Sequence, residues 1–280
     1  MDFDLTPLQR QVRDAARAFA RDVVEPAART TDREERFPFE AYRQMAELGF
    51  LGVNIDAEFG GAGAGTVGYS LAMMEISRAC AATAVGMAVT NMCGELICQF
   101  GTPEQKTKYV SQLVSGQAVA GAFALSEPQC GSDAGALTTS ATQDGKAWRI
   151  NGTKQWITSG AHAGVIVVWA RTSPNGSRGL SCFIVEKGAA GLTIGRPEEK
   201  MGLRGSNTVP LIFENVEVST DAMLGQLGDG FKLAMTALDG GRIGIASQAC
   251  GVARAALAAA VKYVKERQAF GKPIGDFQAL

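Results

Sequence analysis

Two short stretches of the sequence gather the residues best suited to binding a flat, phosphate-bearing ligand. FALSEPQCGSDAG, Phe123 to Gly135, runs from an apolar segment into a loop of acidic, glycine and small polar residues. KQWITSG, Lys154 to Gly160, places a tryptophan just before two hydroxyl side chains. A tryptophan beside hydroxyls and open amides suits a planar, hydrogen-bonding ring system. Gly131 could bring backbone N–H groups close to a phosphate, because it has no side chain to block the approach.

The same residues also fit two ordinary strand-end loops beside a core tryptophan, so residue chemistry alone leaves both interpretations open. Other chemical motifs are weaker. The glycine run from Gly60 to Gly65 does not fit G-x-G-x-x-G in register, and neither a phosphate-binding P-loop nor a G-x-S-x-G motif occurs. His162 is the single histidine, and we interpret it as a turn residue. The six cysteines form no C-x-x-C pair, so we expect free thiols and no metal site.

Composition narrows the class of protein. The chain has 280 residues, a length typical of about two domains. Its 27 basic and 28 acidic residues give a net charge of −1, so we expect no nucleic-acid partner. The longest strongly apolar segment, Ala163 to Ala170, is too short to span a bilayer, and the polar, acidic start is not a secretory signal. These features predict a cytoplasmic protein with no membrane association.

The first third of the chain predicts helices. Thr6-Pro7 and Thr102-Pro103 are each followed by a glutamine at the third helical position, which is the pattern of a capped helix start. Helices should follow over 7–27 and 103–115, and apolar spacing predicts further helices over Phe39–Leu48, Val67–Arg78 and Ala84–Phe100.

The middle third changes to a strand-like pattern. Asp144-Gly145 and Asn151-Gly152 are both tight hairpin signals. They divide the chain into predicted strands over 137–143, 146–150 and 153–159, and three more follow over 163–170, 180–186 and 209–218. The fold class is therefore α+β, with an antiparallel β-barrel or sandwich as the middle domain.

The last third predicts one helix from about Gly230 to about Arg267, although Gly240-Gly241 inside it costs roughly 2 kcal/mol relative to two alanines. We expect an N-terminal helical domain over 1–116, a middle β-domain over 117–227, and the truncated beginning of a C-terminal helical domain over 228–280. A long apolar helix needs packing partners, so this last part either packs on other chains or continues in the natural protein.

Several segments in order resemble the acyl-CoA dehydrogenase family of FAD flavoproteins, and the resemblance covers essentially the whole chain. Besides the two stretches above, the similar segments are LTPLQRQVRDAARAFARDVVEPAA, GFLGVNIDAEFGGAG, FGTPEQKTKYV, KMGLRGSNTVPLIFENVEV, LDGGRIGIASQACGVARAAL and ERQAFGKPIGDFQAL. LDGGRIGIA is most similar to the short-chain and butyryl-type members.

The resemblance implies an FAD site. Ser126 would bond the pyrimidine edge of the flavin, Trp156 would pack along the isoalloxazine, and Thr158 would bond near N5. The full implied cofactor set is Phe123, Leu125, Ser126, Gly131, Ser132, Trp156, Ile157, Thr158, Arg267, Phe270 and Gln278, of which the last three would contact the FAD of a neighbouring subunit. Ser132, Asp239 and Arg242 would lie near the CoA part of the substrate. Glu127 and Pro128 would shape the loop.

The implied reaction is α,β-dehydrogenation of a short-chain acyl-CoA thioester, with electrons passed to an electron-transfer flavoprotein by a homotetramer. A carboxylate removes the α-proton and the β-hydrogen leaves as hydride. In most members the base is a glutamate late in the C-terminal domain, and in a subset it precedes the arginine that matches Arg242, where this chain has Gly241. We therefore expect the base beyond Leu280, and the 280-residue chain to be inactive and to retain FAD weakly.

Two alternatives stay open. The first is a flavin oxidase or monooxygenase of the same fold, since such relatives can lack the usual base. The second is a non-catalytic, acyl-CoA dehydrogenase-like protein.

Overall fold

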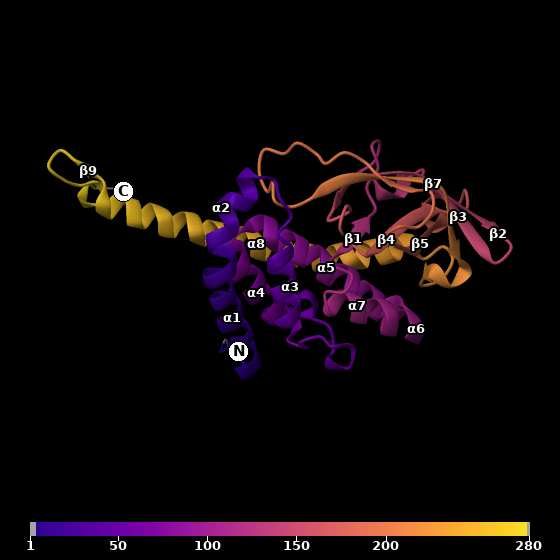
Figure 1. The fold of residues 1–280 in the computed structure, drawn as a ribbon, viewed down its shortest axis with the longest axis horizontal. Coiled ribbons are helices and arrows are strands. Elements are labelled where there is room, and N and C mark those ends of the chain that lie inside the picture. The colour runs from indigo at the N-terminus through magenta and orange to yellow at the C-terminus, as the bar shows by residue number, and fades with distance from the viewer. Residues whose placement is uncertain (1–3, 279–280) are drawn as a thin grey trace.

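The computed structural model describes residues 4–278, and its first third is helical, as predicted (Figure 1). Both capped helix starts are confirmed: the Thr6 hydroxyl accepts from the backbone N–H of Gln9, whose side chain accepts from Thr6, and Thr102 and Gln105 repeat the arrangement. The helices are α1 (Pro7–Phe19), α2 (Glu25–Arg33), α3 (Phe39–Glu47), α4 (Gly65–Ala79), α5 (Ala81–Phe100), α6 (Pro103–Gln105) and α7 (Ser111–Val114), with π-helical segments at Ala20–Val24 and Lys106–Val110.

The first helix is longer than the prediction that ended it at residue 27. Pro26 lacks the N–H that an α-helix interior needs, so a helix is expected to stop or kink near it. Instead the π-helical segment Ala20–Val24 comes just before the proline, and helix continues as α2 to Arg33. The wider hydrogen-bond spacing of the π-helical turn provides a local adjustment where the proline interrupts the regular pattern.

The middle of the chain forms an eight-stranded sheet in the order β6-β7-β3-β2-β4-β5-β8, with β1 beside β4. The strands are β1 (Gly121–Ala124), β2 (Ser140–Asp144), β3 (Ala147–Thr158), β4 (Val165–Arg171), β5 (Leu180–Glu186), β6 (Leu192–Ile194), β7 (Thr208–Ser219) and β8 (Met223–Leu224). Most pairs are antiparallel, but β1 and the start of β2 pair with β4 in parallel, so the sheet is mixed. The predicted fold class, a helical domain followed by a β-domain and a C-terminal helix, is confirmed.

One predicted hairpin is wrong. The turn at Asp144-Gly145 joins β2 to β3 as expected, but Asn151-Gly152 lies inside the continuous strand β3, at an irregularity in its pairing with β7. Gly152 is needed there for a close approach. A Cβ atom at this position would lie 2.4 Å from Oγ1 of Thr139, and φ is +148°.

A second difference concerns the segment 137–143, which was predicted to be a strand throughout. Strand β2 begins only at Ser140. The backbone N–H groups of Thr138 and Thr139 instead donate to the carboxylate of Glu127, at 2.7 and 2.9 Å. A side chain therefore occupies the backbone groups that a longer strand would have used.

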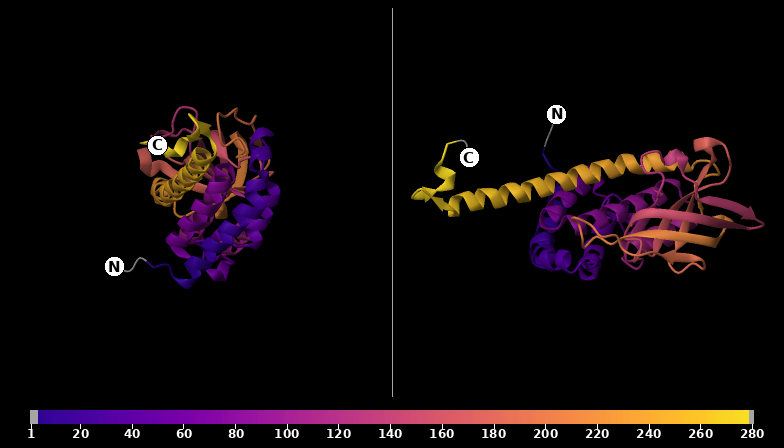
Figure 2. Two further views of the ribbon diagram at one scale, coloured as in Figure 1. Left: turned by 90° about the vertical axis from the view of Figure 1, so that its left-hand side faces the viewer. Right: turned by 90° about the horizontal axis from the view of Figure 1, so that it is seen from above.

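The C-terminal third is dominated by α8 (Gly230–Glu266), the predicted long helix, followed by a hairpin of β9 (Gln268–Ala269) and β10 (Lys272–Pro273). Figure 2 shows α8 running from the sheet along the helical domain and beyond it. Its last buried residue is Gly251, so the following turns are largely exposed. By length and hydropathy α5 and α8 both resemble membrane spans. In α5, however, two thirds of the most apolar stretch of 18 residues is buried inside the protein.

The hydrophobic core joins the helical and β parts. One cluster unites α1, α3, α4 and α5 with the inner side of the sheet, and includes Met45, Met73 and Phe183. A second unites α5 and α7 with the other side of β4 and β5 and with the start of α8, where Leu233 is fully buried. Helix α5 contributes to both clusters, and this fixes the sheet relative to the helices.

Candidate functional site

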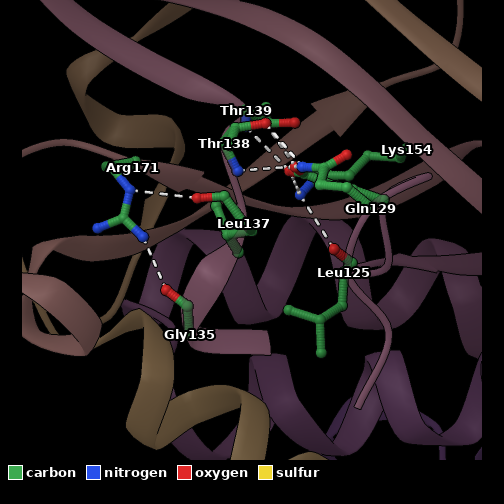
Figure 3. A network of polar contacts seen from close by, with 9 residues as sticks. Leu125, Gln129, Gly135, Leu137, Thr138, Thr139, Lys154 and Arg171 are labelled. Carbon is green, nitrogen blue, oxygen red and sulfur yellow. Dashed lines mark hydrogen bonds and ion pairs between the residues drawn. The ribbon is translucent and has the colours of Figure 1, made fainter. Parts of the chain in front are cut away.

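The two stretches identified in the sequence lie side by side. The backbone N–H of Gln155 donates to the carbonyl of Ser126 at 2.9 Å, and Nζ of Lys154 donates to the carbonyl of Leu125 at 3.1 Å. Figure 3 shows Lys154 reaching toward Leu125 from the neighbouring strand. The binding hypothesis required this proximity, so the loop after β1 and the end of β3 can form a single site.

Trp156 is displayed by an unusual backbone conformation. The pairing of β3 with β7 shifts between Lys154 and Ile157, and Trp156, within this bulge, has φ of 59°. A bulky side chain rarely adopts a positive φ, and bulges often re-aim side chains beside functional sites. The Trp156 side chain is 58% exposed, whereas Ile157 is buried in the core. The tryptophan is therefore not a core residue, and Ile157 can offer a ligand little beyond its backbone.

The apolar residues of the first stretch form a packed floor. Leu125 is buried, and the ring of Phe123 lies against that of Trp169 with 4.3 Å between centroids. Ser126, the next residue, is partly exposed, and so is Thr158 on the neighbouring strand. These hydroxyls are the predicted polar contacts that retain access to solvent.

The tip of the loop is open. Gly131 and Ser132 are both exposed. A Cβ atom built at Gly131 would meet no heavy atom within 4 Å. Neither packing nor backbone strain therefore requires a glycine at this position. Space for a ligand would explain it.

The stem of the loop is held by Glu127, whose side chain is only 1% exposed and is paired with Lys154, Nζ to Oε1 at 2.8 Å. Burial alone would raise the pKa of the Glu127 carboxyl, but the Lys154 charge and hydrogen bonds from Lys154 and the Thr138–Thr139 segment lower it to about 2. Burial lowers the pKa of Lys154, and the Glu127 carboxylate acts against that shift. Sequence reasoning gave Glu127 a shaping role and missed Lys154 altogether.

The predicted C-terminal contacts lie elsewhere. Arg267, Phe270 and Gln278 follow the end of α8, at the opposite end of the molecule from β3 (Figure 1). Phe270 is 95% exposed. One copy of the chain does not bring these residues to Trp156, so they can serve such a site only in another copy.

Asp239 and Arg242 lie on α8, one turn apart. They form an ion pair with each other, Oδ1 to Nη1 at 2.7 Å, and both side chains are more than 70% exposed. This geometry fits an ordinary solvated helix face and equally a charged contact for a ligand.

An apolar cavity of about 400 Å³ lies between α5 and α8. It is lined by Ala88, Val89, Met92, Leu238, Gly241, Arg242 and Ile245. Gly241 leaves space for α5, because a Cβ atom there would lie 3.1 Å from Sδ of Met92.

Glu95 is a partly buried carboxyl that sequence reasoning missed. It lies one turn beyond Met92 on α5, where its Oε1 accepts from Nδ2 of Asn54 at 3.0 Å. Its Oε2 faces α8, 3.8 Å from where a Cβ would lie at Gly240. Burial raises the pKa of Glu95, against the hydrogen bond from Asn54. An acidic residue inside the otherwise uncharged segment 81–100 was the available signal.

The remaining candidates do not join the site. His162 lies in a turn, as predicted, and its ring packs against Phe37 and Phe39, with centroids 4.5 and 4.8 Å away. All six cysteines are free thiols, as expected. Within residues 4–278, no three His, Cys, Asp or Glu side chains are grouped to hold a metal ion.

Comparison with known proteins identifies the family. Residues 6–117, 122–216 and 228–280 match the N-terminal, middle and C-terminal domain models of acyl-CoA dehydrogenase. Acryloyl-CoA reductase (NADH) of Anaerotignum propionicum is 46% identical over all of this chain and 72% of its own length. The short-chain specific acyl-CoA dehydrogenase of Clostridium acetobutylicum is 44% identical, over 100% and 74%.

Solved structures agree. Butyryl-CoA dehydrogenase from Megasphaera elsdenii superposes with a TM-score of 0.97 at 40% identity, over all of this chain and 74% of that one. A chain from the structure described as "Electron transferring flavoprotein of Acidaminococcus fermentans: Towards a mechanism of flavin-based electron bifurcation" also gives 0.97, at 43% identity over 100% and 74%. Family models covering all three parts, together with relatives of this identity and coverage, show that the chain belongs to the acyl-CoA dehydrogenase family.

Proposed function

We propose that this oxidoreductase dehydrogenates a short-chain acyl-CoA thioester between its α- and β-carbons and passes the electrons to an electron-transfer flavoprotein. The observation that carries the proposal is the exposed Trp156, held in a bulge beside the open Gly131–Ser132 loop. An aromatic face next to accessible amides and hydroxyls matches a flat cofactor with a diphosphate.

Members of this family are FAD flavoproteins, and the residues present fit FAD. When bound, FAD supplies the acceptor for the hydride from the substrate. In this chain Ser126, Trp156 and Thr158 would hold the ring system, with the backbone of Ile157 between them and with Phe123 and Leu125 as the floor. Gly131 and Ser132 would accommodate the diphosphate. Arg267, Phe270 and Gln278 would complete the site of a neighbouring copy.

The cavity between α5 and α8 would take the acyl chain, since its lining is almost entirely apolar. Asp239 and Arg242 lie on α8 beside it and would contact CoA together with Ser132. Short acyl chains are favoured because several relatives with more than 40% identity are named short-chain specific. An electron-transfer flavoprotein as acceptor is supported by the related chain in the electron transferring flavoprotein structure.

Gly241 occupies one of the two positions that the family resemblance offers for the general base, so this position supplies no carboxylate. The comparisons give no support to the expectation that the 280-residue chain is inactive, so activity has to be measured directly.

The test is an anaerobic titration of the purified chain loaded with FAD. Butyryl-CoA should reduce the flavin more efficiently than octanoyl-CoA, and air should reoxidise it slowly while an electron-transfer flavoprotein does so rapidly. Failure to take up FAD, or rapid reoxidation in air with release of hydrogen peroxide, would contradict the proposal, and the latter result would favour the oxidase alternative.

A second candidate is the reverse reaction, reduction of an unsaturated acyl-CoA. It is favoured by the 46% identity to an acryloyl-CoA reductase (NADH). The same residues would hold the same flavin, so only direction distinguishes the two. The measurement compares two rates: reoxidation of chemically reduced enzyme by acryloyl-CoA, and reduction of oxidised enzyme by propionyl-CoA. A faster first rate would select the reductase.

Other expectations stay proposals. We propose the domain limits 1–116, 117–227 and 228–280, a cytoplasmic location and a homotetrameric assembly. Size-exclusion chromatography with light scattering tests the last of these.

A further inference from the structure

Lys154 is a fully buried cation, with 0% of its side chain exposed. It lies on β3, two residues before Trp156, and its neighbour Gln155 bonds the backbone of Ser126. Burying an ammonium group is costly unless it is paired and hydrogen-bonded. The Lys154 charge can therefore be kept in the core only if its partners compensate for the lost hydration.

Its direct partners lie at the start of the loop, and one of them, Glu127, also binds the end of the loop. Nζ of Lys154 donates to the carbonyl of Leu125 and to Oε1 of Glu127. The same carboxylate accepts from the backbone N–H groups of Thr138 and Thr139, and from the Thr138 hydroxyl at 2.9 Å. Figure 3 shows Leu125, Thr138, Thr139 and Lys154 gathered around this network of hydrogen bonds. One ion pair thus ties residues 125–127, residues 138–139 and strand β3 together.

A second cation holds the outer part of the stem. The Arg171 guanidinium donates to the carbonyls of Gly135 at 2.7 Å and Leu137 at 3.1 Å (Figure 3), and to that of Gly176 at 2.8 Å. The stem is thereby fixed at several points, whereas Gly131 and Ser132 at the tip are exposed. The loop therefore has a rigid base and an accessible tip.

Stability alone does not account for the ion pair, because apolar groups of the same shape are often equally stable in a core. We propose that Lys154 and Glu127 are positioning residues of the cofactor site, which set Ser126 and the Gly131–Ser132 tip relative to Trp156 before the cofactor binds. Preorganisation of this kind strengthens binding by reducing the ordering that binding requires. The inference rests on the proposed function, since it takes FAD as the ligand.

The test uses the full chain with three variants of the pair: Lys154→Met, Glu127→Gln and the double variant. Each is measured for thermal unfolding without FAD and for FAD affinity by quenching of flavin fluorescence. The single variants should lose stability, because each leaves a buried polar group without its partner. The double variant should regain most of that stability and still bind FAD at least about tenfold more weakly than the wild type, because the loop is no longer fixed.

Glu75→Gln is the matched control. Glu75 is a buried carboxylate paired with Arg17 at 2.9 Å in the helical domain, so its variant should lose stability while retaining FAD affinity. A double variant that regains stability and binds FAD as the wild type does would reduce the pair to a structural role and overturn the inference alone. A wild-type chain that binds no FAD would overturn the proposed function, and the inference with it.

Discussion

At the scale of single residues, the site is distinguished by side chains and backbone that the fold does not need. Trp156 is exposed in a conformation that costs of order 1 kcal/mol or more. Gly131 is a glycine with open space around it. A core tryptophan would be buried, and a glycine required by packing would have other atoms close to the position of a Cβ. Both observations therefore favour the binding interpretation over strand-end loops.

Gly131 provides a direct test, since the Cβ atom of Gly131→Val would meet no heavy atom of the protein within 4 Å. We expect the free energy of unfolding to change by no more than about 0.5 kcal/mol, while affinity for FAD falls because the new side chain occupies the space for the ligand. Gly202→Val is the control, since Gly202 is equally unobstructed and lies outside the loop. Equal FAD binding by the two variants in fluorescence titrations would remove Gly131 from the site.

Glu95 provides a pH-dependent prediction. Burial raises its pKa in the folded protein above the ordinary value of 4.5, so ionisation lowers stability as the pH rises through that folded pKa. Glu95→Gln retains an acceptor for Asn54 and cannot ionise. Its melting temperature should match the wild type near pH 4 and exceed it at pH 7 to 8. Glu58→Gln, at an exposed position, should show no such divergence, and a Glu95 variant that is less stable at pH 8 would refute the argument.

At the scale of elements, most helices and strands could be predicted from local signals because those signals describe local physics. The Thr-Pro-x-Gln pattern satisfies the free N–H groups of a helix start through its own side chains, and both predicted examples were confirmed. Asn151-Gly152 shows the limit: this pair favours a tight turn in isolation, but β3 uses the glycine to pass close to Thr139. The role of Lys154 was equally inaccessible, because its burial depends on a loop nearly thirty residues earlier in the chain.

Helix α8 illustrates two uses of glycine that the sequence does not separate. Gly251 packs tightly on α4, where a Cβ atom would lie 2.0 Å from Oγ of Ser77 and 2.4 Å from the carbonyl oxygen of Met74. Gly240 has only Oε2 of Glu95 nearby, at 3.8 Å. Packing requires the first glycine. No close contact requires the second, which lowers helix stability relative to alanine.

We therefore predict opposite effects of one substitution. Gly251→Ala should destabilise the protein by about 2 kcal/mol or more, because the backbone of α4 cannot yield as a flexible side chain would. Gly240→Ala should stabilise it by up to about 1 kcal/mol through helix propensity. Chemical denaturation of both variants measures the difference. Stabilisation by both would show that α8 is not held closely against α4.

At the scale of the whole molecule, α8 extends beyond the body that it packs against. It is roughly 55 Å long, and its C-terminal part projects past the helical domain (Figure 2). Only 22% of its most apolar stretch of 18 residues is buried inside the protein. Leu257, Val261 and Tyr263 are each at least 43% exposed on its outer half. Such a surface is typical of one that another chain covers. It also presents Arg267 and Phe270 far from the Trp156 of the same copy, so under the proposed function these two residues would serve the site of another copy.

If a second copy covers this surface and contributes Arg267 to the FAD site, self-association and FAD binding must be linked, because each favours the same assembled state. The apparent affinity for FAD should then rise with protein concentration, and FAD should shift the sedimentation profile toward larger species. Leu257→Glu should weaken association and remove the concentration dependence, whereas Met201→Glu, at a fully exposed position before β7, should change neither.

Arg267→Ala should lower FAD affinity most at high protein concentration, where the wild type gains from its neighbour. An FAD affinity that is the same at all protein concentrations, in a wild type that does self-associate, would show that each copy binds the cofactor without help from another.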